Sequence, residues 1–289
     1  MALLEQLRQI VDECVQPPWG AVVKDLMRES IFIRATPDNN IPLGQSKFGG
    51  TPDLPSGAEW PTSGKSQTPL EFIAQINCAD LAEFHVRFPL PTEGILYFFY
   101  HFEADSLGAV IHAANSADLI RSAPPEFGKL NENPPFWKKI FARKKMRLYQ
   151  PCKLNFSLDY TFPESSSIYL ERAGFADQTR DAFCDDYIDR MLERKGQSED
   201  GALNRLFGHP DTVQGQWLEH AVMDEPYPIK TPTEADLDRA LEWKLLLQID
   251  SDSAAEMMWG DLGRIYFYIH QDDLAAQRYD NARVAMDCY

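Results

Sequence analysis

The feature of this chain that most constrains its fold is a segment that occurs twice. Residues 94–101 (Gly-Ile-Leu-Tyr-Phe-Phe-Tyr-His) and 263–270 (Gly-Arg-Ile-Tyr-Phe-Tyr-Ile-His) are identical at four of eight positions. Two further pairs occur upstream in the same order: 48–53 with 207–211, and 75–77 with 248–250. Three matches in one order indicate a chain built from two similar halves that share a core.

The hydrophobic pattern predicts an α+β fold rich in β-structure. Helical spacing predicts helices over residues 3–15, 22–27, 79–84 and 173–195, and a capping box at Thr231–Glu234 predicts another that ends near 241. Short apolar or alternating runs predict strands over residues 31–33, 72–76, 95–102, 153–162, 243–249 and 264–270. Strands and helices are interleaved without a βαβ rhythm, which favours the α+β class.

We predict one compact domain that spans residues 1–289. Its two divergent halves cover about 46–102 and 206–270, a helical lead covers 1–30, and an insertion is predicted at 124–148. The turn-rich stretch 36–66 is expected to be an ordered loop.

Composition limits the partners and the location of the protein. The formal net charge of −16 disfavours general binding to nucleic acid. No apolar run reaches the ~20 residues of a membrane span, and the N-terminus is charged too early for a signal peptide. The five cysteines, at 14, 78, 152, 184 and 288, include no close pair, which is typical of reduced thiols. We therefore expect a cytoplasmic protein.

Several motifs together resemble the YwqG-like family, a bacterial domain family of unknown function. The segments that carry the resemblance are residues 46–55, 60–61, 69–76, 206–210, 246–250, 258–263 and 287–289. The resemblance covers about residues 20–289 and implies a compact α+β unit. It implies no catalytic residue, and residues 138–147 and 175–200 do not match the family pattern.

A set of loops rich in glycine and tryptophan is the candidate binding site. Tryptophan beside lysine and aspartate would form a small cleft with an apolar wall and charged groups. The alternative is that these loops are structural turns and that the tryptophans fill the interface between the halves. The candidate ligand-binding residues are Lys47, Phe48, Gly49, Gly50, Trp60, His209, Trp259 and Asp261.

The absence of a complete catalytic motif favours a non-catalytic module that binds a small ligand or a protein. One alternative is a hydrolase that uses Asp261, His209 and Lys47 in a cleft between the halves. Another is a peripheral membrane protein attached through the basic segment 137–147. We expect no cofactor and no metal, because the acidic residues from Asp250 to Asp261 lack the glycine of a calcium loop and have Ala255 there.

Overall fold

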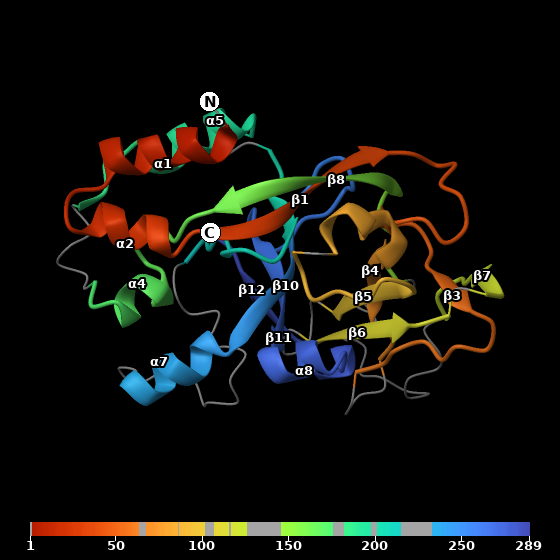
Figure 1. The fold of residues 1–289 in the computed structure, drawn as a ribbon. Helices are drawn as coiled ribbons and strands as arrows, with labels where there is room; N and C mark the ends of the chain where they lie inside the picture. The colour runs from red at the N-terminus through yellow and green to blue at the C-terminus, as the bar shows by residue number, and fades with distance from the viewer. Residues whose placement is uncertain are drawn as a thin grey trace, which may run out of the picture.

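A computed structural model describes the chain except residues 1, 64–67, 86, 102–106, 116, 126–145, 176–181, 198–200 and 215–232. Two helices begin the fold (Figure 1): α1 (Leu3–Cys14) and α2 (Trp19–Asp25). A cis peptide bond joins Pro17 to Pro18 between them. The predicted insertion at 124–148 and the basic segment 137–147 lie almost wholly outside the described residues.

The main element is a ten-stranded antiparallel sheet. Its strand order is β12-β11-β10-β9-β1-β8-β2-β4-β5-β6. The strands are β1 (Arg28–Pro37), β2 (Lys47–Phe48), β4 (Glu71–Asn77), β5 (Ile95–His101), β6 (Leu107–Ala113), β8 (Cys152–Thr161), β9 (Asn204–Leu206), β10 (Trp243–Asp250), β11 (Arg264–His270) and β12 (Arg283–Asp287). A separate two-stranded sheet pairs β3 (Asp53–Pro55) with β7 (Leu119–Arg121).

The strand order runs outward from a central pair in a matched way. Strands β1 and β8 pair over their full length, from Arg28 opposite Thr161 to Pro37 opposite Cys152. On one side follow β2 and the consecutive strands β4, β5 and β6, and on the other side β9 and the consecutive strands β10, β11 and β12. Strand β4 has a bulge between Phe72 and Ala74, and β10 has one between Leu245 and Leu247.

The two edges of the sheet approach each other, so the sheet is nearly closed. Strand β6 lies beside β12, and a Cβ built on Gly108 would come within 2.3 Å of Val284 Cγ2. Buried side chains from both arms of the sheet fill one core, in which the rings of Phe98 and Phe267 meet edge to face at 5.1 Å. The sheet therefore encloses a core to which strands from both ends of the chain contribute.

Helices cover part of the outside of the sheet (Figure 1). A second core joins α1, α2 and α5 (Tyr187–Lys195), with Leu7, Val11 and Met191 buried in it. The shorter elements are η1 (Cys78–Phe84), α4 (Ile168–Arg172), α7 (Glu234–Leu241), α8 (Gln271–Ala275) and η3 (Tyr279–Asn281).

The structure corrects three predicted element boundaries. The helix predicted over 173–195 is confirmed only in α5, because residue 183 forms a β-bridge with residue 15. The capping box is two residues later than predicted: the Thr233 side chain accepts from the Asp236 amide, and Asp236 accepts from the Thr233 amide. The loop predicted over 36–66 contains two short strands, β2 and β3.

Candidate functional site

The first predicted site residue, Lys47, belongs to a buried cluster in β2 and β4. Its ammonium lies 2.9 Å from Asp53 Oδ2, and both side chains are almost fully buried. Gln75 Nε2 donates to the same oxygen at 2.9 Å, and Gln75 Oε1 accepts from the Asp53 amide at 2.9 Å. Burial lowers the pKa of Lys47, whereas its hydrogen bond keeps the pKa of Asp53 below the ordinary value despite burial. The cluster fixes the loop after β2 to the sheet.

A second cluster with the same geometry lies in β9 and β10. Arg205 Nη2 lies 2.6 Å from Asp211 Oδ2, and Gln248 Nε2 donates to that oxygen at 2.8 Å. Gln248 Oε1 accepts from the Asp211 amide at 2.9 Å. Each cluster therefore joins a basic residue of a short strand, an aspartate six residues further on and a glutamine of the next long strand.

The predicted candidate His209 is buried and uncharged. Its Nε2 donates to the Leu26 carbonyl at 2.7 Å, and its ring meets the Tyr169 ring edge to face at 5.0 Å. Burial, followed by the charge of Arg28, lowers the pKa of His209 to about 3. The imidazole thus holds the loop after β9 against the end of α2.

The two predicted tryptophans have their indole nitrogens bonded inside the protein. Trp259 is 1% exposed and donates to the Asp250 carbonyl at 3.0 Å, and its ring lies between Tyr100 and Tyr149. Trp60 is half-buried and donates to the Leu70 carbonyl at 2.9 Å. Trp259 therefore fills the interior, whereas Trp60 remains partly exposed.

The remaining predicted residues are spread over different surroundings. Phe48 is fully buried, and the following Gly49 and Gly50 have left-handed φ angles of 62° and 66°. Asp261 is exposed, and its carbonyl accepts from the amide of the last residue. Among the described residues, no hydrogen bond or ion pair joins Lys47, His209 and Asp261.

A separate cavity of about 490 Å³ opens where β1 and β10 begin. Two aromatic residues line this cavity, Phe88 and Phe207. Their rings are stacked, with centroids 5.0 Å apart and an angle of 13° between their planes. Leu245 and Leu274 complete the apolar lining, the latter from α8. A volume of this size accommodates a small organic molecule.

The backbone of Phe207 is in a conformation that bulky residues rarely adopt. Its φ angle is 59°, and Gly208 follows at 81°. This pair has the same place after β9 that Gly49 and Gly50 have after β2. Glycine adopts this conformation without strain, whereas a phenylalanine there costs about 1–2 kcal/mol. The strained backbone places the Phe207 ring against the cavity. The equivalent residue in the turn after β2 is Gly49, which has no side chain.

Three cationic side chains and one anionic side chain surround this aromatic pair. They are Arg28, Arg87, Lys244 and Glu29. Arg87 forms an ion pair with Glu29, and Lys244 Nζ donates to the Leu241 carbonyl at 2.6 Å. Arg28 donates to the Tyr169 hydroxyl at 2.9 Å. Burial, followed by the charge of Arg28, lowers the pKa of Lys244, as expected for cations gathered around one site.

Sequence reasoning did not find this pocket. The sequence comparison of the two halves aligned Phe207 with Phe48. In the structure Lys47 and Arg205 have equivalent places in the two clusters, so the residue equivalent to Phe48 is Leu206. One signal was available: Arg28 precedes the strand predicted over 31–33, and Lys244 is the second residue of the strand predicted over 243–249. Strand starts that lie at the same end of a sheet bring such side chains together.

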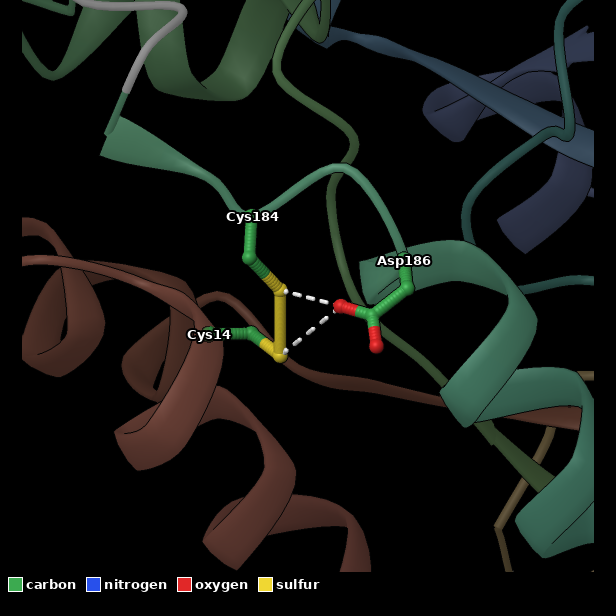
Figure 2. A group of neighbouring side chains, drawn as sticks. All are labelled: Cys14, Cys184 and Asp186. Carbon is green, nitrogen blue, oxygen red and sulfur yellow. Dashed lines mark hydrogen bonds between the residues drawn. A yellow bond between two sulfur atoms is a disulfide. The ribbon is translucent and has the colours of Figure 1, made fainter.

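A group of three side chains, Cys14, Cys184 and Asp186, has the composition of a metal site (Figure 2). The group lies among the helices, and none of its members lines the cavity beside Phe207. Cys14 and Cys184 form a disulfide, and Asp186 Oδ1 lies 2.9 Å from Cys184 Sγ. The prediction of reduced thiols is therefore wrong for this pair, which is distant in sequence but held together by the bridge between residues 15 and 183. Cys78, Cys152 and Cys288 are free, as predicted.

The comparisons with known proteins identify the family but no activity. Residues 46–288 match a family described as a domain of unknown function, DUF1963, and the chain belongs to this family. The prediction of a family of unknown function is confirmed in these terms. The match excludes α1, α2 and β1. A comparison with curated proteins finds no match. In the described part of the chain, no helix has both the length and the apolar character of a membrane span.

Proposed function

We propose that this protein is a non-catalytic binding module for small organic anions. The ligand class is a carboxylate with an aromatic or other flat apolar body, held in the cavity beside Phe207. The observation that carries this proposal is the left-handed backbone of Phe207, since strain of this kind persists where the surrounding structure uses it. The strain is retained in a turn whose counterpart uses glycine.

The charge of the pocket supports an anionic ligand. Cations outnumber anions in its lining, although the whole chain carries a net charge of −16. Arg28 and Lys244 have no acidic partner in the lining other than Glu29, which pairs with Arg87. A carboxylate would complete this set, with its apolar body against the stacked rings of Phe88 and Phe207.

The hydrolase alternative has less support. It requires Lys47, His209 and Asp261 to act together, but Lys47 is occupied by Asp53 and His209 is buried and neutral. The membrane alternative depends on residues 137–147, which lie almost wholly outside the described part of the chain. We retain a cytoplasmic location as part of the proposal, because of the acidic composition.

The proposal also includes the architecture. We propose a single YwqG-like domain over residues 1–289 that arose by duplication. The matched clusters around Gln75 and Gln248 support duplication, as do the equal bulges of β4 and β10.

If the halves are equivalent, Gln75→Leu and Gln248→Leu should lower the free energy of unfolding by similar amounts, about 2–4 kcal/mol each, in urea titrations. A difference of several-fold would argue against equivalence.

The test of the ligand site is a thermal-shift screen with matched pairs of compounds. Aromatic carboxylates should stabilise the protein, and their uncharged amides should not. Lys244→Met keeps the apolar stem but removes the charge, and it should weaken binding about 10-fold or more. Arg172→Gln is the control, because it removes an exposed cation of α4 that pairs with Asp238 of α7.

Phe207→Gly is the second test of the same site. Glycine removes the backbone strain, so the variant should fold, while the aromatic wall is lost and carboxylate binding falls at least 10-fold. The proposal fails if carboxylates and amides shift the melting temperature equally, or if binding survives in both Lys244→Met and Phe207→Gly.

A further inference from the structure

We infer that the Cys14–Cys184 pair is a site of reversible thiol–disulfide exchange with small thiols, independent of the anion pocket. The pair lies outside the sheet, where α1 ends beside the segment that leads into α5 (Figure 2). It connects the N-terminal helices, which precede the family match, to a segment inside that match.

The backbone holds the two sulfur atoms together whether or not they are bonded. Val15 and Phe183 form an antiparallel bridge, and the Cys184 amide donates to the Cys14 carbonyl at 2.8 Å. The Gln16 amide donates to the Ala182 carbonyl at 2.8 Å. A reduced pair would therefore remain in position to form the disulfide again.

The surroundings of the two sulfur atoms differ. Cys14 is 3% exposed, whereas Cys184 is partly exposed. Arg190 Nη1 lies 3.0 Å from Cys14 Sγ, and its Nη2 forms an ion pair with Glu13. Asp186 Oδ1 lies nearer the other sulfur, 2.9 Å from Cys184 Sγ against 4.0 Å from Cys14 Sγ. The guanidinium favours Cys14 as a thiolate, and the carboxylate can accept a hydrogen bond from the Cys184 thiol.

This asymmetry defines the order of bond changes. The thiolate of a small thiol attacks the accessible Cys184 Sγ, the bond between the cysteines breaks, and Cys14 leaves as a thiolate beside Arg190. A second thiolate then attacks the outer sulfur of the mixed disulfide. It releases the small-molecule disulfide and leaves Cys184, which takes a proton from water. In the reverse direction, the Cys14 thiolate attacks the mixed disulfide at Cys184 and expels the small thiolate.

The same observations disfavour a metal at this place. Cys14, Cys184 and Asp186 form the group of potential ligands found among the described residues. A divalent cation bound there would face the Arg190 guanidinium next to Cys14. Like charges at this separation repel, so the arrangement suits a thiolate better than a bound cation.

The experiment uses the full chain with Cys288→Ser, which removes the partly exposed free thiol. Cys78 and Cys152 remain as internal controls, because burial raises the pKa of each thiol to about 12. The protein is equilibrated with glutathione and glutathione disulfide at several ratios, quenched in acid, alkylated and analysed by mass spectrometry. We expect Cys14 and Cys184 to change reversibly between disulfide and dithiol while the buried thiols do not change.

Single variants test the order of the steps. Cys14→Ser should accumulate a glutathione adduct at Cys184, and Cys184→Ser should form little adduct at the buried Cys14. Arg190→Gln should slow reduction of the disulfide about 2- to 10-fold, and Arg190→Lys should restore most of the rate. Reduction should also lower the melting temperature by roughly 5–10 °C.

Three results would overturn the inference. They are a pair that stays reduced at every glutathione ratio, an adduct that forms equally at both cysteines, and reduction that is equally fast in Arg190→Gln. Stoichiometric zinc binding by the reduced protein, lost in Cys14→Ser, would also overturn it and assign a metal site to these residues instead.

Discussion

At the scale of single residues, the most informative groups are Glu164 and His209, whose pKa values the fold shifts away from the ordinary ones. Glu164 is partly exposed at a small cavity that it shares with Tyr187, Lys195, Arg205 and Asp211. Burial, followed by the charge of Asp211, raises the pKa of Glu164 from 4.5 to about 8. The folded protein therefore keeps a proton that the unfolded chain loses.

This difference predicts that Glu164 lowers stability as the pH rises. Between pH 4.5 and about 8 the unfolded state releases the Glu164 proton and the folded state retains it, so the free energy of unfolding falls with rising pH. Glu164→Gln does not titrate and should raise that free energy by about 1–3 kcal/mol at pH 8, with little effect at pH 4. Urea titrations across this range measure it, with exposed Glu59→Gln as control; equal pH profiles in wild type and Glu164→Gln would contradict it.

The lowered pKa of His209 predicts the opposite dependence of stability on pH. Its pKa is lowered from 6.5 to about 3, so between these values the unfolded chain binds a proton that the folded protein excludes. The His209 contribution to stability is thus present above pH 6.5 and is lost as the pH falls toward 3. His209→Gln should be less stable at pH 7 by about 1–2 kcal/mol but should lose less on acidification.

The control for His209 is His85→Gln. His85 also lies against a backbone carbonyl, with Nε2 3.0 Å from the Cys78 oxygen, but it is more exposed. The comparison is a set of urea titrations from pH 7 to pH 4. The explanation is wrong if His209→Gln loses as much stability on acidification as the wild type.

At the scale of elements, the turn after β2 depends on a glycine. Gly49 has a φ of 62°, and a Cβ there would lie 2.4 Å from the Gln150 carbonyl oxygen. Gly49→Ala should therefore lower the free energy of unfolding by about 2–4 kcal/mol through strain and a backbone clash. Gly57→Ala separates the two effects, because Gly57 has a φ of 81° with nothing within 4 Å of the added Cβ. It should cost about 1 kcal/mol, and equal losses in both variants would remove the clash from the explanation.

The same elements show what the sequence could predict. Strands β5, β8 and β11 were predicted because each is a run of apolar or alternating residues, whereas β6, which is as long as β5, was not predicted. The short strands β3, β7 and β12 were also missed, as were β2 and β9, whose burial depends on pairing with other strands. Apolar spacing predicted that residues 182–186 belong to a helix. This segment is not helical, because it forms a β-bridge with the residue that follows α1.

The candidate pocket was beyond prediction for a related reason. Its charged and aromatic residues come from four separate segments, at 28–29, 87–88, 207–208 and 244–245. Only 207–208 falls in a motif that the sequence analysis identified, and the left-handed φ of Phe207 contradicts the usual preference for glycine at such a position. The periodicity of apolar residues identifies single helices and strands. This site depends on how the ends of several such elements are placed next to one another in the fold.

At the scale of the whole molecule, the near closure of the sheet brings its two edge strands, β6 and β12, together. Gly108 of β6 faces Val284 of β12, and a Cβ at position 108 would lie 2.3 Å from Val284 Cγ2 and 2.9 Å from the Phe99 carbonyl oxygen. Closure therefore requires the absence of a side chain at position 108. A chain whose sheet edges were separate would tolerate alanine at that position.

This requirement predicts energetic coupling between residues far apart in sequence. Gly108→Ala should lower the free energy of unfolding by about 2–4 kcal/mol, and Val284→Ala by about 1 kcal/mol. In the double variant the methyl group that clashes is removed, so the combined loss should be at least 1 kcal/mol smaller than the sum of the single losses. The contact with the Phe99 carbonyl remains, so rescue should be partial. Additive losses in a double-mutant cycle measured in urea would mean that β6 and β12 do not meet in solution.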